Sequence, residues 1–117
     1  MPISNETQEF VNYVVDLMQL IGPVMAKRMF GGHGIFLDGL MFGLIADGIL
    51  YLKADKGNET EFIDRGLEAF KYSKKGKEYS MSYYQAPDEA LEDSEVMNHW
   101  ANTAYNTALK AATKNHK

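Results

Sequence analysis

The chain of 117 residues contains no cysteine, only three prolines and no long apolar run. The absence of cysteine excludes disulfides and thiol nucleophiles, and it fits a reducing compartment. No apolar run reaches the roughly 18 residues that a membrane span needs. The start, Met1-Pro2-Ile3-Ser4, lacks the basic and apolar regions of a signal peptide. We therefore expect a cytoplasmic protein with no membrane partner.

Positive charge is also scarce. The 12 Lys and Arg residues against 16 Asp and Glu residues give a formal net charge of −4, which argues against a general affinity for nucleic acid. The length predicts a single domain over residues 1–117, with a frayed tail from about residue 113. An apolar fraction of 45% and a charged fraction of 24% are typical of a globular domain with a sizeable core.

Two Asp-Gly pairs, Asp38-Gly39 and Asp47-Gly48, separate three apolar runs. Asp-Gly between apolar runs is a strong hairpin signal, because a type I′ turn needs positive φ at both central residues. The sequence therefore predicts an antiparallel meander. Its three strands are expected at Met29–Leu37, Leu40–Ala46 and Ile49–Ala54.

Both faces of these strands are apolar. The alternation of the second strand assigns Phe42, Leu44 and Ala46 to one face and Met41, Gly43 and Ile45 to the other. A sheet with one face in water would alternate apolar and polar residues more cleanly. The second face is therefore expected to be covered, either by a helix or by another copy of the chain.

Helical patterns precede and follow the meander. Apolar residues at helical spacing predict a helix over Glu6–Ile21, which Gly22-Pro23 ends. Asn58 and Glu61 form a candidate capping box for a short helix that Gly66 ends. A long last helix is expected over Ser94–Ala112.

A second hairpin lies between the two later helices. Phe70–Tyr72 and Glu78–Gln85 read as its strands, with the turn inside Lys74–Lys77. No connection is long enough for a parallel crossover. The sequence thus predicts an α+β fold of order α-β-β-β-α-β-β-α, with a single antiparallel sheet.

Several segments in this order resemble one protein family. The segments are Arg28–Phe36, Phe42–Asp47, Leu50–Lys53 and Met81–Tyr84, followed by an acidic turn and Trp100. Together they resemble the N-terminal domain of the TfoX family, also called Sxy, which is named for bacterial regulators of DNA-uptake competence. The likeness spans about Phe10 to Ala108. It implies the same element order, in an architecture resembling type III secretion chaperones, which dimerise through similar sheets.

The resemblance implies a non-enzymatic regulatory or adaptor domain. Such a domain would act through protein–protein contacts in competence or transcription regulation, with a protein partner or itself as a homodimer. Full-length competence regulators carry a second, C-terminal domain, and the sequence ends at Lys117 without it. DNA contacts made by that second domain are therefore not expected here.

No motif indicates an enzyme. The three histidines, His33, His99 and His116, form no zinc motif, and no serine lies in a nucleophile elbow. Gly31-Gly32-His33-Gly34 leads into a strand, whereas phosphate loops lead into a helix, so a bend or bulge at the strand start is expected. The acidic stretch Asp88–Glu95 lacks the spacing of a calcium loop. We expect no catalytic residue, no cofactor and no metal site.

The best local candidate for recognition surrounds the glycine-rich segment. Arg28 with Phe30, Gly31, Gly32 and His33 could bind an anion or a partner's carboxylate, through a cation, a ring and backbone amides. Alternatively, Arg28 pairs with an acidic residue of the first helix. A third hypothesis, a small-ligand or enzyme pocket, requires Arg28, His33 and Tyr51 to meet.

The second hairpin carries the alternative function, direct binding of nucleic acid. Its basic and aromatic residues could contact phosphates and stack on bases of a single strand. They are Lys71, Lys74, Lys75, Lys77, Tyr72 and Tyr79. The alternative is a solvated edge, on which the lysines discourage edge-to-edge pairing of strands and the tyrosine rings pack into the sheet. Binding of nucleic acid would weaken steeply with added salt.

Overall fold

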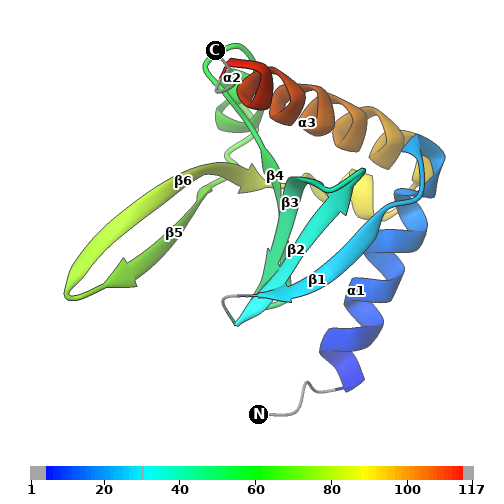
Figure 1. The fold of residues 1–117 in the computed structure, drawn as a ribbon, viewed down its shortest axis with the longest axis horizontal. Helices are drawn as coiled ribbons and strands as arrows, with labels where there is room; N and C mark the ends of the chain where they lie inside the picture. The colour runs from blue at the N-terminus through cyan, green and yellow to red at the C-terminus, as the bar shows by residue number, and fades with distance from the viewer. Residues whose placement is uncertain (1–4, 30, 115–117) are drawn as a thin grey trace.

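The computed structural model describes residues 5–29 and 31–114, and only the backbone at positions 5, 79, 80 and 114. The described residues form one antiparallel sheet of order β1-β2-β3-β4-β6-β5 and three α-helices (Figure 1). In chain order the elements are α1 (Asn5–Leu17), the 3-10 turn η1 (Gln19–Ile21), β1 (Met25–Met29), β2 (Gly32–Leu37), β3 (Leu40–Ala46), β4 (Ile49–Lys53), α2 (Glu59–Ile63), β5 (Ala69–Lys74), β6 (Lys77–Gln85), the 3-10 turn η2 (Asp88–Leu91) and α3 (Ser94–Lys114).

The α+β class with a single antiparallel sheet is confirmed, but the predicted meander lacks a strand. β1 precedes β2 and pairs with it from Met25↔Phe36 to Met29↔Gly32. The expected strand from Met29 to Leu37 therefore contains β2 and only the last residue of β1. Gly31, with φ +75°, lies in the turn between β1 and β2, where we expected a bend or bulge. β1 was missed because it is an edge strand. Backbone pairing holds it there, and its side chains show no clean alternation of burial.

Three tight turns fix the sheet. Asp38, Asp47 and Lys75 each have φ of 53°, and the glycine after each has φ between 73° and 79°. Positive φ at both central residues defines the type I′ turn, whose twist matches that of antiparallel strands. The turns expected at the two Asp-Gly pairs are confirmed, and so is the hairpin across Lys74–Lys77.

A close contact between β2 and β3 depends on a glycine. A Cβ atom at Gly32 would lie 2.2 Å from the carbonyl oxygen of Ile45, far inside van der Waals contact. Gly31, in contrast, has open space around its Cα and needs glycine only for its positive φ. The two neighbouring glycines therefore serve different purposes, close strand approach and turn formation.

All three α-helices contribute to one core on one face of the sheet. Val11 of α1, Phe62 of α2 and Met97 of α3 lie in the same cluster as Ile35 and Leu52 of the sheet. The ring of Phe62 contacts both Tyr84 of β6 and Trp100 of α3. Within residues 5–29 and 31–114 no helix covers the opposite face, so the helical cover considered from the sequence is not found there.

A β-bulge in β3 moves one large side chain to the core. Ile35 pairs with Gly43 while Phe36 pairs with Met41, which leaves Phe42 as the extra residue. Phe42 is fully buried, and its ring lies edge-on to Tyr105 of α3 at 5.7 Å between centroids. The prediction that Phe42 shares a face with Leu44 is therefore wrong. Strict alternation does not hold across a bulge, and Leu44 lies opposite Tyr51 on the other face.

The helix boundaries differ in detail from the predictions. α1 ends at Leu17, and η1 covers the rest of the predicted helix up to Gly22. The capping box is wrong, because the Asn58 side chain accepts a hydrogen bond from the Asp55 amide at 2.7 Å and donates one to Thr107 at 3.1 Å. Asn58 thus ties the loop before α2 to α3.

Because of the bulge, truncation of a side chain to alanine should lower the free energy of unfolding by different amounts at two neighbouring positions. We expect Phe42→Ala to lower the free energy of unfolding by about 3–5 kcal/mol, because it leaves a cavity in the core. Met41→Ala, on the opposite face, should cost clearly less, because Met41 is only half-buried. Urea unfolding of both variants measures the difference. Equal costs, or a larger cost at Met41, would contradict the bulge.

Candidate functional site

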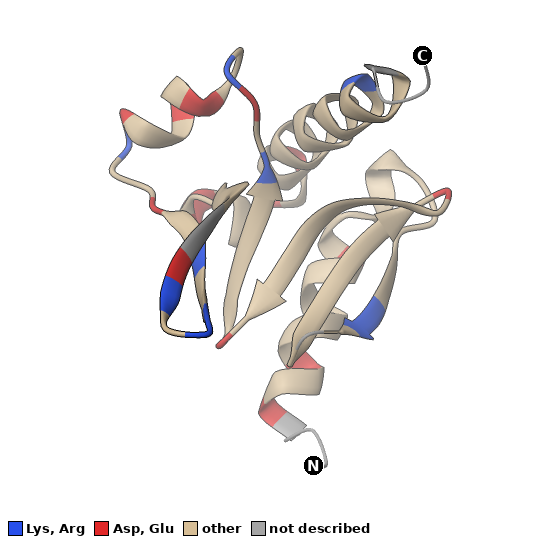
Figure 2. Ribbon diagram, turned by 60° about the vertical axis from the view of Figure 1, so that its left-hand side comes forward, with Lys and Arg blue, Asp and Glu red and all other residues tan. Residues whose placement is uncertain are grey.

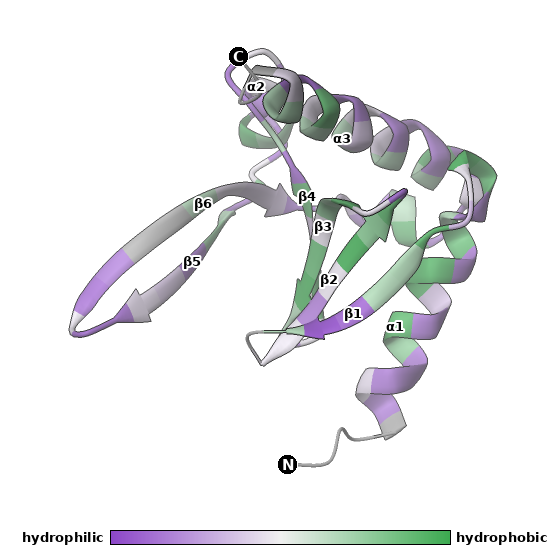
Figure 3. Cartoon of the chain, viewed as in Figure 1, coloured by the Kyte–Doolittle hydropathy of each residue, from purple (hydrophilic) through white to green (hydrophobic). Residues whose placement is uncertain are grey.

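The sheet face turned away from the helices is apolar, and we call it the outer face. The cross-strand pairs Met25↔Phe36, Phe36↔Met41 and Leu44↔Tyr51 define it, because paired residues share a face. Its apolar residues are Met25, Met29, Phe36, Met41, Leu44, Ile49, Tyr51, Phe70, Tyr72, Met81 and Tyr83. The apolar character of β2 and β3 is visible along the ribbon in Figure 3.

Side chains on the outer face contact one another. The sulfur atoms of Met29 and Met41 and the ring of Phe36 converge over Gly34, where an added Cβ would lie between 2.5 and 3.3 Å from them. The Tyr51 ring lies edge-on to Phe70 at 5.0 Å. Of the eleven apolar residues of this face, three are exposed, two are buried and six are partly buried.

Two lysines on the outer face lie over aromatic rings. The Lys27 ammonium is 5.5 Å from the Phe36 centroid, and the Lys53 ammonium is 5.2 Å from the Tyr83 centroid. Burial raises the pKa of Tyr83 to about 12. Burial, with the charges of Asp47 and Glu68, also raises the pKa of Tyr51. Both phenols are therefore neutral at pH 7, and neither provides a phenolate.

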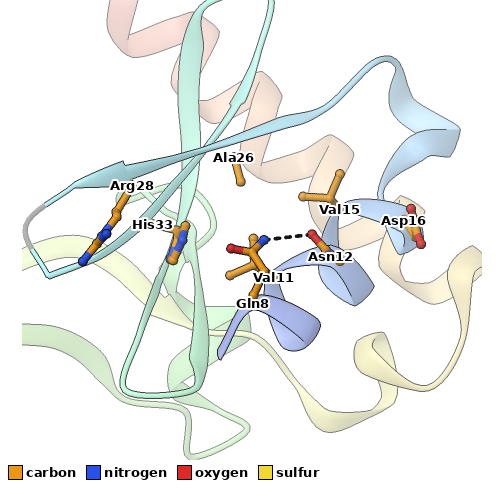
Figure 4. A pocket seen from close by; sticks show the side chains of 8 residues that line it. All are labelled: Gln8, Val11, Asn12, Val15, Asp16, Ala26, Arg28 and His33. Atoms are coloured by element: carbon orange, nitrogen blue, oxygen red, sulfur yellow. Dashed lines mark hydrogen bonds between the residues drawn. The ribbon is translucent and has the colours of Figure 1, made fainter. Parts of the chain in front are cut away.

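The opposite side of the sheet contains a groove of about 610 Å³ between α1 and the first two strands, which we call the β1 groove. Its lining residues come from three elements (Figure 4). They are Gln8, Val11, Asn12, Val15 and Asp16 of α1, Ala26 and Arg28 of β1, and His33 of β2. Gln8 donates a hydrogen bond to Asn12 at 3.0 Å within the groove.

His33 is the buried polar residue of this groove. Arg28 is its cross-strand partner, and its side chain is only 7% exposed. Its Nδ1 atom has no hydrogen-bond partner among the described residues. Burial, and then the charge of Arg28, lower the pKa of the imidazole, so that it is neutral at pH 7. A neutral imidazole can either donate or accept a hydrogen bond at Nδ1.

The structure brings together two of the residues predicted from the sequence and separates a third. Arg28 and His33 line one groove, whereas Tyr51 lies on the outer face, so the pocket of Arg28, His33 and Tyr51 is not formed. Neither Gly31 nor Gly32 lines the groove. Phe30 lies outside the described residues.

Sequence reasoning missed the helical wall of the groove. Gln8, Asn12 and Asp16 follow one another at a spacing of four residues, so they lie along one side of α1. This polar stripe borders the apolar residues Val11 and Val15. That boundary between polar and apolar residues was the sequence signal that could have indicated the wall of the groove. Without β1 in the predicted fold, nothing indicated which element would face the stripe.

The lysines of the second hairpin are exposed near its end (Figure 2). Lys74 pairs with Lys77, and Lys75 lies in the turn. Neighbouring residues of a strand point to opposite faces, so Lys71 and Tyr72 do not form one joint surface. The backbone of Tyr79 pairs with Tyr72, while its side chain is not described. Nucleic-acid binding by this hairpin stays a prediction.

His99 does not line the groove. His99 of α3 lies edge-on to Trp100 at 6.0 Å, and His116 falls outside the described residues. In the described part of the chain, no three His, Asp or Glu side chains gather as metal ligands would. Over the same residues no helix has both the length and the apolar character to cross a membrane.

The described residues form a small α+β domain with an apolar outer sheet face and a groove beside β1. The family model of the TfoX N-terminal domain matches residues 16–108, and the chain belongs to this family. It is 31% identical over 86 residues to the DNA transformation protein TfoX1 of Aliivibrio fischeri, covering 74% of this chain and 39% of that protein. It is 25% identical over 76 residues to the protein Sxy of Escherichia coli, covering 65% of this chain and 36% of Sxy. The chain thus spans less than half the length of these curated relatives.

Burial of His33 predicts a pH dependence of stability. Its pKa is lowered in the folded state, so the unfolded chain binds more protons around the ordinary value of 6.5. Stability should therefore fall as the pH falls through that value, and level off below the folded pKa.

Urea unfolding at about pH 7.5 and about pH 5.5 measures this loss of stability. We expect the loss to be smaller in His33→Gln than in the wild-type chain. The matched control, His99→Gln on the exposed side of α3, should keep the wild-type dependence. Identical pH dependence in His33→Gln and the wild-type chain would refute the assignment to His33.

Proposed function

We propose that this chain is a non-enzymatic regulatory domain of bacterial DNA transformation, which acts through protein contacts at the outer face. Family membership supports the pathway, because a similar protein is named a DNA transformation protein. The domain corresponds to well under half of that protein, so the proposal concerns the part played by this domain.

The uncovered outer face is the observation on which the proposal depends. Within the described chain it is left without a helical layer, and Met25 is 61%, Tyr72 42% and Met81 38% exposed. An apolar sheet face that no helix covers and that keeps large exposed side chains is a candidate interaction site. Four of the seven methionines lie on this face. Methionine is flexible and polarisable, and it is frequent on surfaces that adapt to a partner.

The partner proposed for this face is a second copy of the chain. A two-fold interface brings the same patch of both subunits together, so charged patches repel and apolar patches fit. The lysines on this face, Lys27 and Lys53, already lie over aromatic rings of the same face. An apolar sheet face of this kind can therefore pack against its own copy.

Among the described residues, the titratable groups are not assembled as a catalytic group, which favours binding over catalysis. The phenols of Tyr51 and Tyr83 are held neutral, and His33 is separated by the sheet from Tyr51. General acid or base catalysis requires a group whose pKa lies near the pH at which the enzyme works. The group must also lie within reach of the substrate, and usually of a second polar group. The expected cytoplasmic location stays a prediction.

Charged substitutions on the outer face test the proposal. We expect Met25→Asp combined with Met81→Asp to weaken dimerisation by about tenfold or more, because each buried carboxylate would lose its hydration. Sedimentation velocity over a concentration series measures the dimer. Leu20→Asp combined with Leu109→Asp is the matched control, because these residues are 62% and 41% exposed and lie on η1 and α3.

The same two variants decide the biological part of the proposal in the bacterium that encodes this chain. Uptake of a marker DNA should fall with the outer-face variant and stay at the wild-type level with the control. A chain that is monomeric at all concentrations would overturn the dimer. Unchanged uptake after deletion of the coding sequence would overturn the regulatory role.

A further inference from the structure

The geometry points to the β1 groove as a docking site for an extended peptide segment that carries an acidic side chain. The segment would add as a new strand beside β1, with alternate side chains entering the groove next to α1. This surface is separate from the outer face and does not depend on the function proposed above.

The backbone of β1 provides the first argument. Among the described residues, β1 is an end strand of the sheet and pairs with β2 alone, so half of its backbone N–H and C=O groups point away from the sheet. α1 runs beside β1 and leaves a groove between them, which Figure 4 shows from close by. In strand addition an extended peptide pairs with an exposed sheet edge, and pockets for its alternate side chains provide specificity.

The other edge of the sheet lacks this arrangement. β5 is the opposite end strand, and no described cavity is lined by its residues. Lys71 and Lys74 occupy this edge strand, and lysines on an edge discourage pairing with another strand. The two edges of the described sheet therefore differ, because a groove lies beside β1 and lysines occupy β5.

The lining of the groove determines which side chains fit. Val11, Val15 and Ala26 are apolar, and Val11 is only 2% exposed. A small or β-branched side chain of the peptide would therefore be buried against them. Successive side chains of an added strand point to opposite faces, so residues two apart share a face. The small or β-branched side chain and a polar side chain two residues away can therefore both enter the groove.

The charges of β1 favour an acidic segment. Lys27 and Arg28 lie next to each other on this strand, so pairing of β1 with its own copy would bring like charges together. Arg28 lies beside His33 at one end of the groove, and Asp16 lies at the other end (Figure 4). An acidic side chain is thus expected at the end with Arg28 and His33.

The buried imidazole of His33 supports the same placement. A buried polar atom without a hydrogen-bond partner costs free energy, and Nδ1 of His33 has none in the described part of the chain. A carboxylate from the peptide could accept a hydrogen bond from the imidazole. It would also offset the charge of Arg28, which lowers the pKa of His33. Docking would then be accompanied by a rise in the pKa of His33.

A selection experiment tests the inference without knowledge of the natural partner. A displayed library of random linear heptapeptides is selected against the complete chain. We expect the recovered peptides to share Asp or Glu at one position, flanked at alternate positions by small or β-branched residues. Amide NMR shifts on adding a recovered peptide should map to Met25–Met29 and His33.

Matched variants of β1 make the result specific. We expect Arg28→Gln to weaken peptide binding by about tenfold or more, and Lys27→Gln, on the same strand but the opposite face, by less than about twofold. His33→Gln is the second variant. Docking that raises the pKa of His33 makes peptide affinity rise as the pH falls, and this pH dependence should disappear in the variant. Free glutamate, the small-anion probe, should bind far more weakly than the peptide.

Several outcomes would overturn the inference. They are failure to recover any binder, binding insensitive to Arg28→Gln, shifts that map to the outer face, and free glutamate binding as tightly as the peptide. The two proposals fail separately. Met81→Asp should leave peptide affinity unchanged, and Arg28→Gln should leave the oligomeric state unchanged.

Discussion

The register of the sheet is the constraint on which the rest of this structure depends. Each two-residue turn leaves no freedom for its strands to slip, because both central residues adopt positive φ and the second is glycine. A slip of one residue would exchange the two faces of a strand. The division of the molecule into a helix-covered face and an outer face therefore follows from Asp38-Gly39, Asp47-Gly48 and Lys75-Gly76.

Features set by local sequence could be predicted well. The turns and the strands beside them follow from short signals, and so do the helices, because positive φ and helical spacing are properties of a few consecutive residues. The position of β1 and the face of the sheet on which Phe42 packs could not be predicted from local sequence. They depend on pairing with β2 and on space beneath α3, which involve residues distant in the sequence.

For the candidate residues, too, local features could be predicted and contacts between distant parts of the chain could not. Arg28 and His33 were singled out for their chemistry, and the hairpin of β1 and β2 brings them together as a cross-strand pair. Tyr51 was grouped with them from residue type alone, but it belongs to the opposite face. The wall formed by α1 could not be inferred, because it requires the position of β1 in space.

The approach of β3 to Gly32 also limits how this domain can diverge. A methyl group at position 32 would collide with a main-chain oxygen, and a backbone atom cannot move aside as the end of a flexible side chain can. Position 31 is less restricted, since asparagine and aspartate tolerate its left-handed backbone at modest cost. Among homologous chains that keep this sheet, residue 32 should accept no replacement, whereas residue 31 should drift among the few amino acids that turns allow.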